Sequence, residues 1–305
     1  MLKGATTMRN AVLGMDIGGT HMRMGFVDES LQLSEYNMAP SNLISGTGAA
    51  GRLAVFVKEY IEKTGILPSA VSVGFPSTLD KQRRVLLSTP NIEGLSGVPA
   101  AKIMEEELGL PVFINRDVNL LFLYDCHVHQ LHGPGVNLGI YVGTGLGNVI
   151  SINGEILVGK NGVAAELGHI PGWQLNAPCP CGNTGCLEMY ASGKHLKEIR
   201  DQYFPQTPIG ELFIRHGVEA QLQAFVECLS IPIATEINIL DPDHIILGGG
   251  VLQMEGFPTE LLEKYIYNHA RKPYPADNLH ILYSNQAQEN GVIGAAIHGY
   301  LELEK

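Results

Sequence analysis

The chain has 305 residues, of which 45% are hydrophobic and 17% charged, and its net charge at pH 7 is −11. That length predicts about two domains with a sizeable core. Phosphate backbones are bound by clustered Lys and Arg, so the acidic balance argues against a nucleic-acid partner and favours a small-molecule ligand. No apolar run approaches the roughly 20 residues of a membrane span, and residues 1–8 lack the apolar core of a signal peptide. We therefore expect a cytoplasmic protein with no membrane partner.

The predicted elements begin with strands and a glycine turn, and then alternate between strand and helix. Residues 10–36 are typical of an apolar strand, a glycine-rich turn and two more strands in a meander. The apolar periodicity then predicts four further elements. They are a helix at 49–65, a strand at 70–76, a helix at 99–110 and a strand at 111–115.

A second series of the same kind follows. It is predicted to contain a helix at 117–130, two strands around a glycine turn at 136–156, a long helix at 217–240, a strand at 244–250, a helix at 258–270, a strand at 279–284 and a last helix at 291–305. Strands that alternate with helices predict an α/β fold built of layers.

Glycine turns occupy corresponding places in the two series. DIGGT spans residues 16–20 and GTGLG spans 143–147, and a third glycine run, ILGGG, lies at 246–250. Glycine lets backbone N–H groups approach phosphate oxygens. Neither turn fits the P-loop or the dinucleotide fingerprint, and a single glycine turn is more often only a hairpin. Taken together, they favour a nucleotide held between duplicated lobes.

Three of the five cysteines fall within eight residues. Cys179, Cys181 and Cys186 form the pattern C-x-C-G-x-x-G-C, ten residues after His169. A disulfide with a spare thiol, a redox dithiol and a metal site are the competing interpretations. The C-x-C step is too tight for an easy disulfide and is not a redox C-x-x-C, whereas the glycines let three sulfurs gather around one point. With His169 they would form the closed Cys₃His shell of a structural zinc, the alternative being reduced thiols in a loop.

Five motifs together resemble the ROK family of sugar kinases and repressors. They are DIGGT, GTGLG, E-L-G-H at 166–169, C-x-C-G-x-x-G-C-x-E at 179–188 and DPDHIILGGG at 241–250. The resemblance covers about residues 9–305 and implies a two-lobed, actin-like fold of the hexokinase type. We expect an N-terminal α/β lobe at 1–116, onto which the C-terminal helix at about 290–305 packs back. The second lobe is expected at 117–289 and would carry the zinc loop at 166–188.

The family's functional roles can be carried onto matching positions. The resemblance implies Asp117 as the catalytic base that accepts the proton of the attacking sugar hydroxyl, although an acid here could also cap the helix that follows. Asp16 would act on Mg²⁺ through water. One ring nitrogen of His169 would bind zinc while the other faces the sugar, so that zinc is architectural. The ATP-binding residues would be Gly14, Met15, Asp16, Ile17, Gly18, Gly19, Thr20, His21, Gly143, Thr144, Gly145, Leu146, Gly147, Asn148, Gly248, Gly249 and Gly250. The sugar-binding residues would be Ser77, Asn91, Arg116, Asp117, Glu166, His169 and Glu188, and the zinc ligands His169, Cys179, Cys181 and Cys186.

The chain as a whole is most similar to the D-allose kinases of this family, which implies transfer of the γ-phosphoryl group of ATP to the 6-OH of D-allose. Departures from the family pattern bear on the sugar. Arg116 stands where Asn is usual, and Ser77 where Gly is common. A guanidinium fork addresses different hydroxyls from a short amide, so we expect Arg116, with help from Ser77, to turn preference from glucose towards allose. A surface cation paired with a nearby acid is the alternative for Arg116.

Other functions stay open at this point. The chain could phosphorylate glucose, fructose or an N-acyl hexosamine, or it could be a sugar-sensing ROK repressor that lacks a DNA-binding domain. A third hypothesis is a zinc-stabilised ATPase or interaction module of another actin-fold class. The resemblance also makes a homodimer possible. The expected ligands are therefore a hexose, ATP with Mg²⁺, and a structural Zn²⁺.

Overall fold

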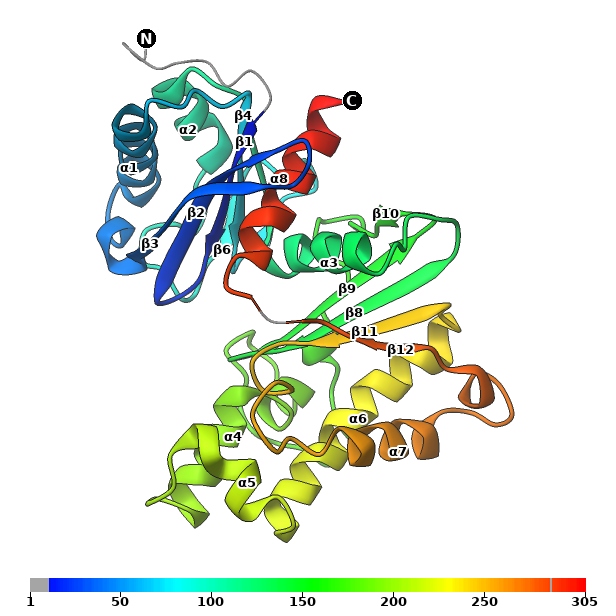
Figure 1. The fold of residues 1–305 in the computed structure, drawn as a ribbon. Helices are drawn as coiled ribbons and strands as arrows, with labels where there is room; N and C mark the ends of the chain where they lie inside the picture. The colour runs from blue at the N-terminus through cyan, green and yellow to red at the C-terminus, as the bar shows by residue number, and fades with distance from the viewer. Residues whose placement is uncertain (1–10, 286) are drawn as a thin grey trace. The chain divides into compact units, whose positions relative to one another are not determined.

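The computed structural model describes residues 11–285 and 287–305, and the chain within these ranges divides into two compact units (Figure 1). The first unit comprises the described residues up to Gln130, together with Val158–Ala164 and Ala287–Lys305. The second comprises Leu131–Leu157 and the described residues of 165–286. The expected features of residues 1–8 lie outside the described residues.

The first unit is built around a five-stranded sheet with the strand order β3-β2-β1-β4-β7. β1 pairs antiparallel with β2 and parallel with β4, and β4 pairs parallel with β7. The strands of the unit are β1 (Ala11–Ile17), β2 (His21–Asp28), β3 (Leu33–Pro40), β4 (Ala70–Phe75), β5 (Thr78–Leu79), β6 (Leu86–Ser88) and β7 (Val112–Arg116), and the helices are α1 (Ala49–Thr64), α2 (Ala100–Leu108), α3 (Asp117–Val128) and α8 (Asn290–Leu303).

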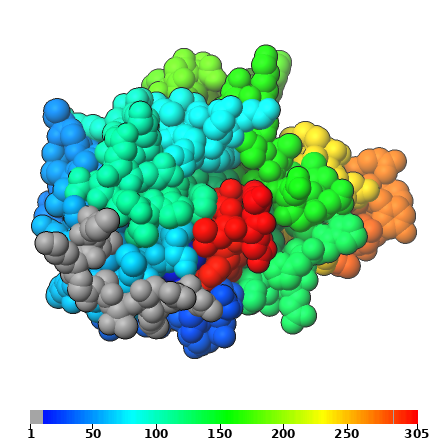
Figure 2. All heavy atoms as spheres, turned by 90° about the horizontal axis from the view of Figure 1, so that it is seen from above, coloured from blue at the N-terminus to red at the C-terminus, as the bar shows by residue number. Residues whose placement is uncertain are grey.

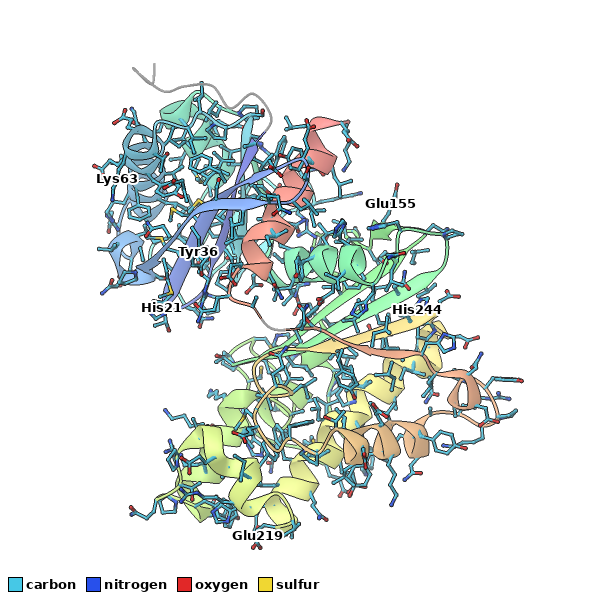
Figure 3. All side chains as sticks on the ribbon, in the orientation of Figure 1. His21, Tyr36, Lys63, Glu155, Glu219 and His244 are labelled. Atoms are coloured by element: carbon cyan, nitrogen blue, oxygen red, sulfur yellow. The ribbon has the colours of Figure 1, made fainter. Side chains whose placement is uncertain are left out.

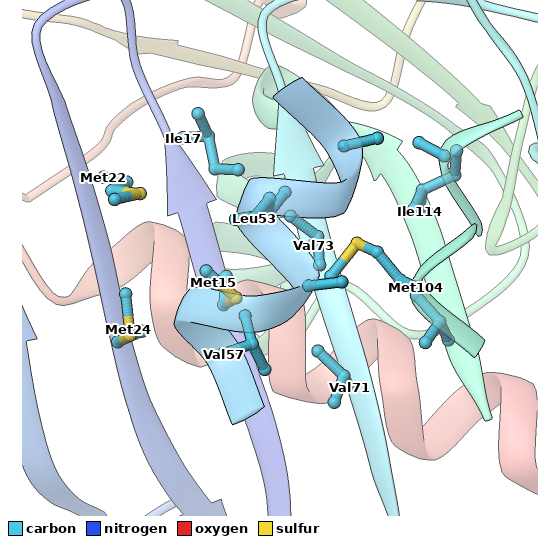
Figure 4. Packing of buried hydrophobic residues seen from close by; sticks show 14 of the residues in the cluster. Met15, Ile17, Met22, Met24, Leu53, Val57, Val71, Val73, Met104 and Ile114 are labelled. Atoms are coloured by element: carbon cyan, nitrogen blue, oxygen red, sulfur yellow. The ribbon is translucent and has the colours of Figure 1, made fainter. Parts of the chain in front are cut away.

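Helices cover both faces of this sheet, which explains why β1 and β4 are apolar almost throughout. α1 buries Leu53, Val57 and Ile61 at helical spacing and ends at Gly65, whose φ of 71° suits a glycine. Figure 4 shows α1 on the strands, with Met15 and Val73 among the side chains below it. α8 covers the opposite face.

The second unit repeats the same plan with the strand order β10-β9-β8-β11-β12. β8 and β9 form an antiparallel hairpin, while β11 lies parallel to both β8 and β12. One core joins these strands to the helices of the unit. Its strands are β8 (Val136–Val142), β9 (Leu146–Ile152), β10 (Glu155–Ile156), β11 (His244–Gly248) and β12 (Ile281–Tyr283), and its helices are α4 (Gly193–Tyr203), α5 (Leu212–His216), α6 (Ala220–Leu240) and α7 (Thr259–His269).

Sequence and structure differ in several places. The predicted elements include neither the short strands β5 and β6 nor the helices α4 and α5, and the long helix predicted at 217–240 begins at Ala220. The division into units places α3 in the first unit, whereas the expected lobe boundary falls just before Asp117. The reason is packing, because α3 lies against α8, β4 and β7 of the first unit. α8 belongs to the first unit, in agreement with the expectation for the C-terminal helix.

Among the described residues, one helix is long and apolar enough to be examined as a membrane span. This is α6, and 56% of its most apolar window is buried inside the protein. α6 lines the core of the second unit through Leu222, Phe225 and Ile233, which explains its hydrophobicity.

Candidate active site and metal centre

Asp117 is the first residue of α3 and directly follows the end of β7. Its Oδ1 accepts a hydrogen bond from the backbone N–H of Val118 at 2.8 Å. The N-cap position of α3 belongs to Arg116, so Asp117 does not hold the capping position considered for it. Gly74 on the neighbouring strand allows this close packing. A Cβ there would lie 3.3 Å from the Asp117 Cα and 2.7 Å from the Leu120 side chain.

Burial is the larger cause, and together with the neighbouring carboxylate of Asp16 it raises the pKa of Asp117 to about 7. The Val118 N–H and the Arg116 guanidinium oppose this shift without cancelling it. A carboxylate with a pKa near neutrality can accept a proton and release it again at physiological pH. The first unit therefore contains a group suited to general base catalysis.

Asp16 is held by two features of the first unit. It lies opposite Arg23 in the β1–β2 register, with its Oδ2 3.7 Å from Arg23 Nη1. It also packs onto the first turn of α8, where a Cβ on Gly291 would lie 2.7 Å from the Asp16 Cγ. The N-terminus of a helix favours a negative charge. Burial raises the pKa of Asp16 and Arg23 lowers it.

The DIGGT turn connects β1 to β2. The backbone N–H of Gly18 donates to the carbonyl of His21 at 2.8 Å, and the Ser41 hydroxyl donates to the carbonyl of Gly18 at 2.7 Å. The side chain of Asn91 lies against this turn, because a Cβ on Gly19 would approach it to 3.3 Å. Figure 3 shows His21 at the turn end of β2. The turn thus brings Asn91, an expected sugar-binding residue, close to the expected phosphate loop.

Three residues expected to bind ATP lie inside the protein instead. Met15 and Ile17 are fully buried in the core, and a Cβ on Gly14 would lie 2.1 Å from the carbonyl of Val292 in α8. The strand is covered on both faces, so the side chains of Met15 and Ile17 point into the core. The nucleotide-binding role expected of Asp16 and of the turn residues from Gly18 to His21 stays a prediction.

The GTGLG turn connects β8 to β9 in the second unit and is held from two sides. The start of α4 contributes the backbone N–H of Gly193, which donates to the carbonyl of Gly143 at 2.8 Å. Glu188 contributes Oε2, which accepts from the backbone N–H of Leu146 at 2.9 Å. A Cβ on Gly145 would lie 2.5 Å from the same oxygen. Glu188 thus joins the expected sugar site to the expected phosphate turn.

The Asn148 side chain turns away from this loop into the interior, so the structure gives no side-chain support to its expected role in ATP binding. It is buried, and its Nδ2 donates to Glu236 Oε2 at 2.8 Å and to the carbonyl of Gly139 at 3.3 Å. The alternation of side chains along β9 points it into the interior. The third glycine run, which begins at Gly248, follows β11, and Gly249 has a φ of 94° that allows close packing on Val142.

The ligand atoms of His169, Cys179, Cys181 and Cys186 all lie within 4.8 Å of one another. Cys179 Sγ is 3.6 Å from His169 Nδ1, and Cys181 Sγ is 3.6 Å from Cys186 Sγ. Tetrahedral zinc with Zn–S bonds of about 2.3 Å needs sulfurs about 3.8 Å apart, so this set fits the ion. Gly185 shapes the loop: its φ is 74°, and a Cβ there would lie 2.3 Å from the carbonyl of Leu175.

The other ring nitrogen of His169 faces the acid that precedes it by three residues. Its Nε2 lies 3.7 Å from Glu166 Oε2, and the backbone N–H of His169 donates to the carbonyl of Glu166 at 3.0 Å in a short 3₁₀ turn. A metal on Nδ1 would therefore fix the direction of Nε2 and the place of Glu166.

Ser77 and Arg116, the two departures from the family pattern, are both engaged within the first unit. Ser77 is buried and shares a short hydrogen bond with the Thr89 hydroxyl. Arg116 Nη1 donates to the carbonyl of Ala164 at 3.1 Å.

Several residues that shape these sites were missed from the sequence. Gly74, Gly193 and Gly291 each leave room for a close approach that no spacing rule predicts. The Ser-Gly pair at 192–193 is a partial exception, because Ser192 caps α4 and a serine before an amphipathic stretch is a recognised helix start.

Comparison with known proteins agrees with this architecture. A model of the ROK family matches residues 12–298. An N-acetyl-D-glucosamine kinase of Vibrio parahaemolyticus is 28% identical, over 93% of this chain and 97% of its own. A glucokinase of Halalkalibacterium halodurans is also 28% identical, over 92% of each chain. The crystal structure of a ROK hexokinase from Thermus thermophilus superposes with a TM-score of 0.77 at 28% identity, over 96% of this chain and 99% of that one. With its fold and its glycine turns in agreement, the chain belongs to the ROK family.

Proposed function

We propose that this protein is an ATP-dependent hexose kinase that transfers the γ-phosphoryl group to the 6-OH of an aldohexose. The observation that carries the proposal is Asp117, a partly buried acid at a helix start whose pKa is raised to about 7. Phosphoryl transfer to an alcohol needs a positioned acceptor for the hydroxyl proton, with most of the remaining catalysis coming from electrostatics. A sugar-sensing repressor has no need of such a base.

The nucleotide would be bound by backbone groups of the two glycine turns. Gly18, Gly19 and Thr20 offer one set, and Gly143, Thr144 and Gly145 offer the other. Gly248, Gly249 and Gly250 would flank the adenosine. Asp16, held between Arg23 and the start of α8, would orient the water shell of Mg²⁺, and the ion supplies charge neutralisation on the phosphates when bound.

The sugar would be bound by paired acids and a histidine. Glu166, His169 and Glu188 offer acceptors for vicinal hydroxyls, with Asn91 as an amide partner and with Ser77 and Arg116 shaping the pocket. Zinc on the Cys₃His set would hold this loop and take no part in the reaction. The fit of the four ligand atoms within 4.8 Å supports that role.

For the sugar itself we propose D-allose, on the grounds that the chain resembles the D-allose kinases of the family and that Ser77 stands where glycine is common. The names of the relatives support a second candidate, since the similar proteins include kinases of N-acetyl-D-glucosamine and of glucose. We further propose a cytoplasmic enzyme without nucleic-acid or membrane partners, with a homodimer as the form to test.

A hexose panel tests the function and the sugar together. Purified protein would be incubated with ATP, Mg²⁺ and D-allose, glucose, fructose or N-acetyl-D-glucosamine, with ADP release as the readout and kcat/KM as the measure. A highest kcat/KM for allose is expected. A higher value for another hexose would replace allose but keep the kinase, whereas no ADP release with any sugar would reject the kinase itself.

A further inference from the structure

The loop at residues 158–164 belongs to the first unit, although the residues on both sides of it belong to the second. It is closed on itself, because the backbone N–H of Ala164 donates to the carbonyl of Val158 at 3.2 Å. Gly162 packs against β5 so tightly that a Cβ would lie 2.4 Å from the carbonyl of Leu79. Its φ of 85° is a further requirement for glycine.

Two arginines bind this loop through its main chain. Arg83 Nη1 donates to the carbonyl of Gly162 at 3.1 Å, and Arg116 Nη1 donates to the carbonyl of Ala164 at 3.1 Å. Burial is the main cause that lowers the pKa of Arg83 to about 10, and the nearby positive charge of Arg116 is the second cause. Two like charges repel one another, so the cost of placing both cations at carbonyls of the same short loop must be offset by the hydrogen bonds that they make.

Both arginines extend from rigid positions. Arg83 lies in the turn between β5 and β6, where Asp80 Oδ1 accepts the backbone N–H groups of Arg84 and Val85, each at 2.7 Å. Arg116 ends β7, a strand paired along its length with β4. The loop is therefore anchored to elements that fix its position within the first unit.

The residues that follow the loop are those that the proposed function assigns to the sugar. Ala165 comes next, with a φ of 64° that a side chain rarely adopts, and Glu166 follows it. A strained backbone of this kind persists only where its surroundings hold it. A loop fixed up to Ala164 constrains the main chain from which Glu166 extends.

We propose that Arg83 and Arg116 are positioning residues for the sugar site, which act by holding the 158–164 loop rather than by contacting the sugar. The proposal rests on the proposed hexose kinase function. It assigns Arg83 a role that no sequence motif predicts, and it replaces the sugar-hydroxyl contact expected for Arg116. Because the loop acts on every hexose alike, loss of either anchor should affect all of them by a similar factor.

The test combines amide hydrogen exchange with steady-state kinetics in Arg83→Gln, Arg116→Gln and the double variant. Arg84→Gln is the matched control, because this adjacent arginine bonds Glu105 and the carbonyl of Val112 and does not contact the loop. In the sugar-free protein, exchange at residues 158–166 should rise at least several-fold in the first three variants and stay unchanged in the control. The sugar KM should rise about 3- to 10-fold with the KM for ATP unchanged, and the double variant should show less than the product of the single effects.

Three results would overturn the proposal. Unchanged exchange in Arg83→Gln would mean that the anchor does not hold the loop. A changed allose-to-glucose ratio in Arg116→Gln without a change in exchange would mean that Arg116 contacts the sugar directly. An equal effect in Arg84→Gln would mean a general loss of stability. Exchange is measured without substrate, so the anchoring is judged even if the protein phosphorylates no hexose.

Discussion

At the scale of single residues, the chemistry depends on how a few carboxylates are buried. Asp117 and Glu188 were expected from motifs; Asp117 begins α3, and Glu188 lies within a short 3₁₀ turn at 187–189. The sequence could not indicate that Glu188 binds the backbone of Leu146, nor that Gly291 makes room for Asp16. Such contacts join residues that are far apart in the chain, and local sequence patterns do not predict them.

Replacing Asp117 by Asn should remove the proposed base and leave the fold intact. Asn has the same size, so we expect a loss in kcat of about 10²- to 10⁴-fold, the usual contribution of a general base. In the wild type, kcat/KM should rise as pH increases through about 7, because Asp117 must lose its proton to act. In Asp117→Asn, kcat/KM should not show this rise with pH. Near wild-type turnover at pH 8 would show that another group is the base.

Glu236 offers a second carboxyl whose protonation can be tested, this time through stability. Burial raises its pKa to about 8 from the ordinary 4.5, and Asn148 opposes the rise. Between these values the folded protein holds a proton that the unfolded chain has lost, so the free energy of unfolding falls as pH increases. The fall should reach a few kcal/mol at about 1.4 kcal/mol per pKa unit.

Glu236→Gln should flatten this dependence, as measured by urea unfolding at pH 5 and pH 8. Glu227→Gln, at an exposed position of the same helix, is the control and should keep the wild-type slope. Equal slopes in the wild type and in Glu236→Gln would mean that Glu236 is already ionised in the folded protein.

At the scale of elements, the loop at 169–186 stands out because it has little regular structure to hold it. The loop is held by backbone hydrogen bonds between residues close in sequence, such as the one from the N–H of Cys179 to the carbonyl of Asn183 at 2.9 Å. The spacing of the cysteines was enough to predict that their sulfurs gather with His169. It could not predict that α4 follows and supports the GTGLG turn, because the start of α4 depends on a local cap and on packing against Gly143.

Cys181→Ser should therefore loosen the loop and weaken sugar binding more than ATP binding. A structural zinc contributes to folding, so a lower Tm and less bound metal are expected together. The measurements are elemental analysis, thermal unfolding, and the KM values for sugar and ATP. Cys228→Ser is the control, since this residue lies in α6 outside the set of four ligands. Wild-type protein that contains no zinc after preparation without chelators would remove the basis of this prediction.

At the scale of the whole molecule, the alternation of strands and helices predicted two α/β units, and the strands of each sheet were nearly all anticipated. The boundary between the two units was harder to predict from the sequence. α3 begins with an expected catalytic residue, yet it packs with the elements that precede it. The sequence could not predict that the 158–164 loop belongs to the first unit. Its place there depends on hydrogen bonds from Arg83 and Arg116 and on the close packing of Gly162 against Leu79.

The place of α8 also constrains the order in which the protein can be completed during synthesis. Val12 and Val27, close to the start of the chain, pack with Val292 and Ala296, close to its end. The end of α8 lies at the surface next to residues of the N-terminal half (Figure 2). A ribosome makes β1 before the second unit and α8 after it, so one face of the first sheet stays uncovered until α8 has been made. A premature stop before α8 would leave that apolar face exposed to other chains.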